Sequence, residues 1–384
     1  MNTRDLFLSL LQSAIGERDV SVEAKESLNS GSIATLFKVS RAHDMAHLVA
    51  YAAEKAGVSL TGEVGELFEK EKKTAVLRYE MMKADMAEIF DCFDKESIEY
   101  IPLKGAVLRQ YYPEPWMRTS CDIDILVREE DLERSTRALV EKCGYVTDNK
   151  KTYHDVSLFS PFGMHIELHH NIKEDTDKYD RVLTRVWEYS KKENEKSYML
   201  LQSPEFLMVH LMCHMAYHFV GGGCGVRSVL DIWLLGKSIS FDKELLDSLL
   251  KEAGLTKFYC SIKSLAEYWF GSLTEVDKTV LEIERFILLG GVYGTKKQGA
   301  AAKQVKKGGK LKYFWSRIFM PYRSLVILYP VIKKHKILTP FCQIHRWFSV
   351  IFKGKRIAKE IKNVSGVTQE QADRTERLLN DLEI

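Results

Sequence analysis

Two aspartates interrupt an apolar stretch of the sequence, Cys121–Val127, which reads Cys-Asp-Ile-Asp-Ile-Leu-Val. If this stretch is a β-strand, successive side chains point to opposite faces, so Asp122 and Asp124 share one face. Two carboxylates on one face of an apolar strand repel each other and lose hydration. A divalent cation between them would offset both costs, so the pair predicts a metal site. Asp-x-Asp pairs also occur at exposed strand ends and helix caps, and the prediction therefore needs further support.

A third carboxylate supplies that support. The stretch Met164–His169 also alternates, with Glu167 and two histidines on one face and apolar residues on the other. Beside the first strand, Glu167 would complete a cluster with Asp122 and Asp124 whose hard oxygen ligands suit Mg²⁺, with Mn²⁺ as a substitute. Two such ions could hold a triphosphate and stabilise a leaving pyrophosphate. Glu167 could also serve as general base toward an acceptor hydroxyl.

A Lys-Gly pair precedes the aspartates in a position that favours phosphate binding. Lys104 and Gly105 lie between a predicted short strand, Ser97–Leu103, and a predicted short helix, Ala106–Tyr111. Glycine allows the backbone to approach a phosphate closely, and the N-terminus of the following helix offers free N–H groups. The Lys104 ammonium would add a positive charge. Both residues are therefore expected to bind nucleotide.

Three further charged residues have two kinds of interpretation. Arg118 lies in a proline-rich loop just before the aspartates, and it either contacts the nucleotide or pairs with a buried acid. Arg227 and Asp231 are four residues apart, so a salt bridge within one helix is the simplest expectation.

Three histidines, His210, His214 and His218, recur every four residues on one face of a predicted helix. A zinc site is conceivable, but the glutamate that accompanies paired helical histidines in zinc enzymes is absent. The pattern favours core or cleft-lining histidines, with His214 expected at the nucleotide.

The surrounding sequence predicts mostly helices. A helical pattern extends from Thr3 to about Phe93, and the acidic first turn of Glu129–Lys142 begins another helix, which Gly144 is placed to end. A further strand is expected at Tyr153–Phe159. Ser203 is placed as the N-cap of the histidine-bearing helix.

Taken together, these motifs resemble those of the DNA polymerase β-type nucleotidyltransferase superfamily. They are more similar still to a bacterial family of uncharacterised nucleotidyltransferases, over roughly residues 100–235. The matching residues are Leu103-Lys104-Gly105, Tyr111-Tyr112-Pro113, Arg118, Asp122–Val127, Gly144-Tyr145, Glu167-Leu168-His169, His210, His214, Arg227 and Asp231. One position departs from the superfamily pattern, because Ala106 stands where a small hydroxyl residue usually follows the glycine.

The resemblance implies an α+β fold with a small mixed β-sheet nucleotidyltransferase core, flanked by N-terminal and C-terminal helical regions. Four regions are expected: helices over 1–95, the core over 96–200, a helical domain packing on the core over 201–293, and a basic, aromatic-rich helical arm over 294–384. The implied activity is transfer of a nucleoside monophosphate from an NTP, such as ATP, with two Mg²⁺ ions. The acceptor stays open among a sugar phosphate, a tRNA and a protein. Two alternatives also stay open: a catalytically silent module that binds nucleotide or nucleic acid, and a glycosyltransferase that uses Asp122 and Asp124.

Charge is distributed unevenly along the chain. Residues 294–364 contain 18 Lys and Arg and one acidic residue, so this segment carries +17 and leaves −14 for the rest of a chain whose net charge is +3. It also contains ten aromatic residues, among them Tyr313, Phe314, Trp315, Phe319, Trp347, Phe348 and Phe352. Such a segment suits RNA or an anionic membrane surface, reached through residues 294–363. A solvated helical domain with an aromatic core is the alternative.

Composition also bears on location. Seven cysteines without a C-x-x-C pair indicate reduced thiols. Arg4 and Asp5 interrupt the N-terminal apolar residues, which argues against a secretory signal. No run of about 18 apolar residues occurs, so no transmembrane segment is expected. The expected location is cytoplasmic, with peripheral binding to the inner membrane face as one outcome of the basic segment.

Overall fold

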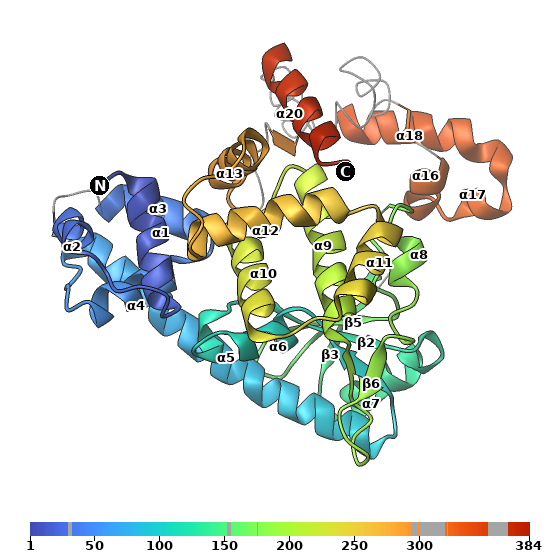
Figure 1. Ribbon diagram of the computed structural model, residues 1–384. Helices are drawn as coiled ribbons and strands as arrows, with labels where there is room; N and C mark the ends of the chain where they lie inside the picture. Colours follow the sequence, from blue (N-terminus) through green and yellow to red (C-terminus); the bar gives the residue numbers. More distant parts are fainter. Residues whose placement is uncertain are drawn as a thin grey trace.

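A computed structural model of the 384-residue chain describes residues 1–29, 33–151, 155–174, 176–292, 298–299, 319–320, 322–351 and 368–384. Helices surround one five-stranded mixed sheet in these residues (Figure 1), which confirms the predicted α+β class. None of the described helices is both long enough and apolar enough to span a lipid bilayer.

The acidic strand lies in the interior of the sheet, beside the central strand. Its strands are β1 (Tyr100–Pro102), β2 (Asp122–Val127), β3 (Val146–Lys151), β4 (Asp155–Phe159) and β5 (His165–His169), in the order β1-β2-β5-β4-β3. β2 and β5 pair in parallel, and the other neighbours are antiparallel. The register sets Asp124 directly beside Glu167. The sequence pattern had placed both residues on strands, and the pairing brings them together.

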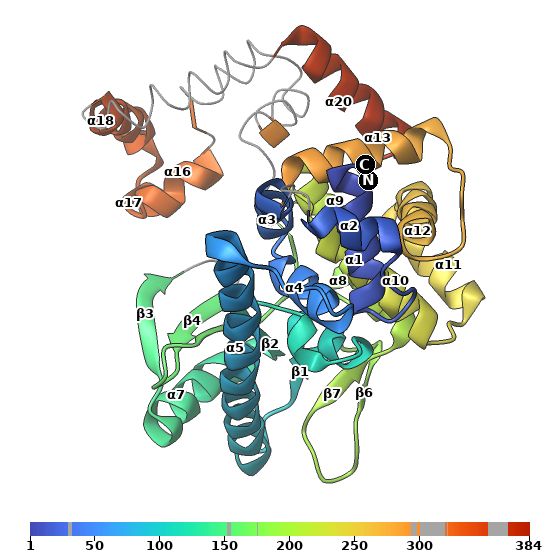
Figure 2. The same cartoon turned by 90° about the vertical axis from the view of Figure 1, so that its left-hand side faces the viewer.

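Two helices cover the apolar face of the sheet. The helix α5 (Gly62–Lys95) runs along it next to α7 (Leu132–Cys143) (Figure 2). The buried residues of this layer include Met82, Ile89, Phe93, Ile98, Ile123, Ile125, Val127, Leu139, Ile166 and Leu168. Because side chains alternate along β2, the aspartates point away from this core, as predicted. Gly144 ends α7 with a φ of 72°, a left-handed conformation that glycine adopts without steric cost.

A second, larger core joins helices from both ends of the described sequence. Its N-terminal helices are α1 (Thr3–Ala14), α2 (Val22–Asn29), α3 (Ile33–Ala42) and α4 (Ala46–Lys55). They share buried contacts with α9 (Pro204–Val220), α10 (Val226–Ser238), α11 (Lys243–Ala253), α12 (Thr256–Phe270) and α13 (Lys278–Gly290). Ser203 caps α9 by accepting a hydrogen bond from the Phe206 N–H, as predicted. This cap fixes where the histidine-bearing helix begins.

Three strands were not expected from the sequence. β3 is an edge strand that pairs only with β4, and β6 (Ser190–Lys192) pairs only with β7 (Leu200–Gln202). An edge strand needs no continuous apolar face, so the polar residues of Val146–Lys151 gave no alternation to detect. The strand expected at Tyr153–Phe159 begins at Asp155 within the described residues.

The short helices near the site differ slightly from expectation. The predicted helix at Ala106–Tyr111 is a short α6 (Gly105–Leu108) followed by a 3₁₀ turn over Arg109–Tyr111. The predicted first turn of α7 is likewise 3₁₀, over Glu129–Asp131. Another short helix, α8 (Asp180–Leu183), packs near α11.

The basic C-terminal region is described in part. Its described helices are α16 (Tyr322–Leu328), α17 (Val331–Lys334), α18 (Thr339–Ile351) and α20 (Gln369–Asp381). In both views α16, α17 and α18 lie together at the periphery, away from the sheet (Figures 1 and 2). The linker expected at Gly299–Gly309 falls, except for Gly299, outside the described residues, as do Tyr313, Phe314, Trp315 and Phe352.

Candidate active site

The three predicted carboxylates lie together on the polar side of the central strand pair. Asp122 and Asp124 come from β2 and Glu167 comes from β5. Ligand atoms of Asp124, Glu167 and His169 lie within 4.8 Å of one another, and so do those of Asp122, His165 and Glu167. Glu167 belongs to both groups. We call Asp122, Asp124 and Glu167 the carboxylate cluster.

Negative charge is crowded in this cluster. Burial raises the pKa of Asp122, and the neighbouring charges of Asp124 and Glu167 raise it further. Burial also acts to raise the pKa of Asp124, but the Lys104 charge and a hydrogen bond from His169 outweigh it and lower the pKa. The two aspartates therefore differ, because the cationic neighbours outweigh burial at Asp124 and do not at Asp122.

His169 is the partner that the sequence interpretation did not assign to the site. Its Nε2 lies 2.9 Å from Asp124 Oδ1 and 3.4 Å from Glu167 Oε2. Burial acts to lower its pKa, but these two carboxylates raise it to about 9, so the ring is protonated at neutral pH. The strand alternation that placed His169 on the face of Glu167 was the available signal.

Lys104 is the second cation of the site. Its Nζ lies 3.9 Å from Asp124 Oδ2, and its backbone has a φ of 41°, which is uncommon for a residue with a side chain. Lys104 and His169 together offset part, but not all, of the charge of three carboxylates. Oxygen donors with surplus negative charge are the set that binds Mg²⁺ or Mn²⁺, so the residues fit such an ion.

Gly105 is required by close packing. A Cβ at this position would meet Ser120 Oγ at 3.0 Å and Arg118 Nη1 at 3.2 Å. Its neighbourhood is therefore occupied by two polar side chains of the loop before β2. The sequence prediction was that glycine here lets the backbone approach a phosphate closely. The structure gives a second reason for glycine, because a Cβ would press against Ser120 and Arg118.

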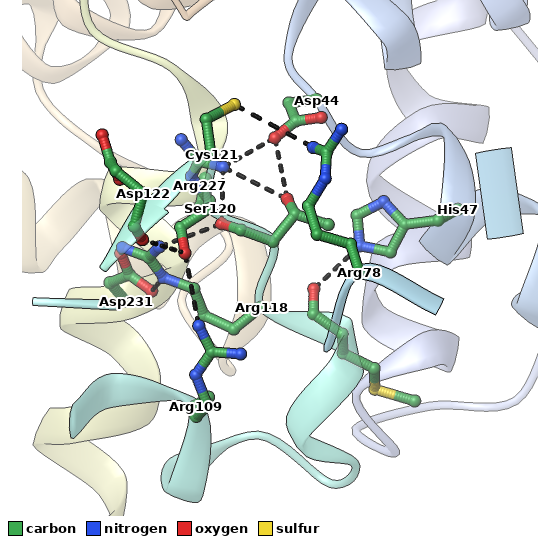
Figure 3. A network of polar contacts seen from close by, with 12 residues as sticks. Asp44, His47, Arg78, Arg109, Arg118, Ser120, Cys121, Asp122, Arg227 and Asp231 are labelled. Carbon is green, nitrogen blue, oxygen red and sulfur yellow. Dashed lines mark hydrogen bonds and ion pairs between the residues drawn. The ribbon is translucent and has the colours of Figure 1, made fainter. Parts of the chain in front are cut away.

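Arg118 pairs with a buried acid, Asp231, which is one of the two alternatives expected from the sequence. Its Nε lies 3.1 Å from Asp231 Oδ1, its Nη2 lies 2.9 Å from Oδ2, and the Tyr112 hydroxyl donates to Oδ1 at 2.7 Å (Figure 3 shows the arginine and the aspartate). This two-pronged pair is buried, which is the geometry in which arginine binds carboxylate most strongly. Asp231 raises the pKa of Arg118, against the opposing effect of burial.

The predicted salt bridge between Arg227 and Asp231 is wrong. Arg227 Nη1 instead lies 2.7 Å from Asp44 Oδ2 and donates to the Thr119 carbonyl at 2.9 Å (Figure 3). The physical reason is that Arg118 and Tyr112 already occupy the Asp231 carboxylate. We call the set Arg118, Asp231, Tyr112, Arg227, Asp44 and Thr119 the arginine network.

A third arginine, Arg109, links this network to the acidic strand. Arg109 donates to the Gly105 carbonyl at 2.7 Å. It also donates to Ser120 Oγ at 3.2 Å, and the Ser120 hydroxyl donates to the Asp122 carbonyl at 3.1 Å (Figure 3). Burial lowers the pKa of Arg109 to about 10, with a further contribution from the charge of Arg118. The loop before β2 is thus held at several points.

A cavity of about 840 Å³ opens over the carboxylate cluster. Its lining includes Lys104, Asp122, Asp124, Glu167, His214 and Arg227. This volume lies in the range usual for small-molecule sites. The predicted site residues Gly105 and Arg118 also line it, so all seven predicted site residues meet at one cavity.

The histidine series contributes unequally. His214 and His218 line the main cavity, whereas His210 lines a smaller neighbouring one of about 200 Å³. His214 Nδ1 lies 2.8 Å from Glu174 Oε1, and burial lowers the pKa of the ring. Among the described residues, no group with metal-ligand geometry includes any of the three, which fits the cleft-lining interpretation.

Part of the cavity wall comes from far along the chain. Leu379 and Asn380 of α20 and Val292, after α13, line the same space as the carboxylates. The sequence interpretation placed no site residue beyond His214. A contribution of this kind leaves no local pattern in the sequence, because it depends on how distant helices pack.

Comparison with known proteins gives a family for this arrangement. The family described as "Uncharacterised nucleotidyltransferase" matches residues 29–271. No curated protein matches the chain. Among solved structures, the chain is similar to the solution structure of the antibiotic-resistance factor ANT(2'')-Ia, at 13% identity over 46% of this chain and 92% of that chain, with a TM-score of 0.33.

Proposed function

The chain belongs to the uncharacterised nucleotidyltransferase family, and from this premise we propose a Mg²⁺-dependent transfer of a nucleoside monophosphate from an NTP to an acceptor. Membership establishes the enzyme class; the metal, the donor and the acceptor are the proposed part. One observation carries the proposal. Asp122, Asp124 and Glu167 converge from two paired strands onto a cavity of about 840 Å³.

In this proposal the carboxylate cluster holds two Mg²⁺ ions, for which Mn²⁺ can substitute. When bound, the ions would neutralise the triphosphate and stabilise the charge on the leaving pyrophosphate. His169 orients the Asp124 carboxylate through the 2.9 Å contact. Lys104 adds positive charge near the phosphates, and Glu167 can accept the proton of the attacking hydroxyl.

The remaining predicted residues have supporting roles in the same proposal. Gly105 and the N-terminus of α6 border the phosphates, and His214 borders the nucleotide. Arg118 is held by Asp231, so its main contribution is to fix the loop that precedes Asp122. A sugar phosphate, a tRNA end or a protein side chain could be the acceptor.

Two competing functions make different predictions. A silent nucleotide-binding module is favoured by Ala106, since no hydroxyl follows Gly105. Retention of three crowded carboxylates opposes it, because a site without metal gains nothing from their repulsion. A glycosyltransferase using Asp122 and Asp124 would be expected to place a larger nucleotide-binding α/β unit before them; the described residues before β1 form helices.

The test is transfer of label from each α-³²P-labelled NTP, with Mg²⁺, to RNA, protein and small-molecule pools of a fractionated lysate. We expect label in one pool, lost in Asp122→Asn and retained in Asp91→Asn. Asp91 is a matched control because it is an exposed aspartate of α5 paired with Lys95. NTP binding without transfer to any pool would contradict the enzyme proposal and favour the silent module. Transfer that survives Asp122→Asn would contradict the assigned site.

A further inference from the structure

The helical unit formed by α16, α17 and α18 carries large apolar side chains on its outside. Ile337 is 84% exposed and Phe341 is 68% exposed, and Leu328, Val331 and Ile344 are exposed as well. Phe341 and Ile344 are three residues apart on one side of α18, and Ile337 lies in the 3₁₀ turn Lys336–Leu338 just before this helix. Exposed apolar side chains grouped in this way commonly mark interaction sites.

These side chains are not needed to build the unit itself. Leu325 and Ile332 are fully buried between its helices. Side-chain hydrogen bonds join the helices too: the Tyr322 hydroxyl donates to the Ile332 carbonyl at 2.8 Å, and Gln343 Nε2 donates to the Met320 carbonyl at 2.6 Å. The unit therefore has an interior of its own, and the outer apolar residues are left for another surface.

The charge of the α16–α18 unit limits the kinds of partner surface that this unit can bind. Between Phe319 and Ile351 the sequence has five Lys and Arg and no acidic residue. Lys333, Lys334 and Lys336 are exposed and immediately precede Ile337. A partner must therefore be anionic as well as apolar.

The exposed side chains distinguish a lipid surface from RNA. Single-stranded RNA is bound by exposed aromatic rings on which bases stack. Here Trp347 packs edge-on against Phe319 with ring centroids 5.4 Å apart, and Tyr329 packs against His345 and bonds to it at 2.9 Å. Among the described residues from Phe319 to Ile351, seven large apolar side chains are exposed and four of them are aliphatic. Aliphatic side chains insert between lipid chains but do not stack on bases.

We propose that the α16–α18 unit binds peripherally to an anionic lipid bilayer. Ile337, Phe341 and Ile344 enter the boundary between headgroups and acyl chains, and Lys333, Lys334 and Lys336 contact the lipid phosphates. This binding brings the nucleotidyltransferase cavity to the membrane surface.

The test is sedimentation of the full-length protein with vesicles of phosphatidylcholine alone or of phosphatidylcholine mixed with phosphatidylglycerol. We expect binding to the anionic vesicles only, weakened by salt. The double variant Ile337→Ser/Phe341→Ser should bind about tenfold more weakly, since two apolar side chains are lost. The triple variant Lys333→Gln/Lys334→Gln/Lys336→Gln should bind weakly and lose its salt dependence.

Two controls separate this result from folding and from catalysis. Phe162→Ser removes an aromatic side chain that is 74% exposed on the turn between β4 and β5, and it should bind vesicles like the wild type. Asp122→Asn should also bind like the wild type. Equal binding of the wild type to both vesicle types would overturn the proposal. Unchanged vesicle binding in the double variant would also overturn it. A third contrary result would be a wild type that binds no vesicles but binds RNA in a gel-shift assay, with this RNA binding lost in the triple variant.

Discussion

Two groups of charged residues border the same cavity in this protein, and they are balanced differently. In the arginine network two arginines pair with two aspartates, and Arg118 donates to both carboxylate oxygens of Asp231. The carboxylate cluster sets three carboxylates against Lys104 and His169. A matched network is complete in itself and supports the fold. A mismatched cluster keeps residual charge that a ligand can satisfy, which supports the proposal that it is the site of chemistry.

The largest effect that would test this contrast is on catalysis. Asp122→Asn should lower nucleotidyl transfer about a thousandfold, because each tenfold in rate corresponds to about 1.4 kcal/mol and a metal supplies several. Its free energy of unfolding without Mg²⁺ should be unchanged or higher, because burial and the charges of Asp124 and Glu167 raise the pKa of this carboxyl and make its ionised form unfavourable. Initial rates and urea denaturation measure the two quantities. A strongly destabilised Asp122→Asn would show that the cluster also supports the fold.

A substitution in the arginine network should instead lower mainly the free energy of unfolding. Asp231→Ala leaves the Arg118 guanidinium buried without its carboxylate, so the free energy of unfolding should fall by about 3–5 kcal/mol. Urea denaturation measures the change. Asp231→Asn, which keeps part of the hydrogen bonding, should lose less. If Asp231→Ala unfolds like the wild type but cannot turn over substrate, the network belongs to the chemistry.

Metal addition should distinguish the two groups in one experiment. Mg²⁺ at about one hundred times its dissociation constant should stabilise the wild type by about 2.7 kcal/mol. Thermal denaturation with and without Mg²⁺ should show this gain in Asp231→Asn and not in Asp122→Asn. Equal stabilisation of both variants would place the ion elsewhere.

The smallest expected effect is at Gly105, which borders both groups. Gly105→Ala pushes a methyl group against Ser120 and Arg118, which should cost about 1–3 kcal/mol of stability. Gly236→Ala is the matched control: its added methyl group meets nothing within 4 Å in α10, so stability should hold or rise. A neutral Gly105→Ala, measured by urea denaturation, would show that the loop before β2 adjusts freely.

Local patterns in the sequence were sufficient for the strands that carry the carboxylates. The alternation in Asp122–Val127 and around Glu167 identified both faces, and Gly144 and Ser203 marked helix ends correctly. These features depend on neighbouring residues alone. The same reasoning failed for Asp231, whose partner lies 113 residues earlier. Spacing within a helix suggested Arg227, and only the packing of α10 against the loop before β2 selects Arg118.

The edge strand β3 and the cavity wall formed by α20 could not be predicted for the same reason, because both depend on contacts between distant parts of the chain. β3 is stabilised by hydrogen bonds to β4 and needs no apolar pattern, so its residues resembled a loop. Leu379 and Asn380 reach the cavity because α20 packs near α13. Neither fact can be deduced from a window of ten or twenty residues.

The separation of Arg118 from Asp231 also has a consequence for biosynthesis. A ribosome adds roughly 5–20 residues per second, so the aspartate is made about ten seconds after the arginine. Until then the sheet that bears the carboxylates lacks the charge that anchors its loop. The nascent chain therefore anchors this loop only after α10 has left the exit tunnel, and it completes the wall of the cavity only when α20 has been made.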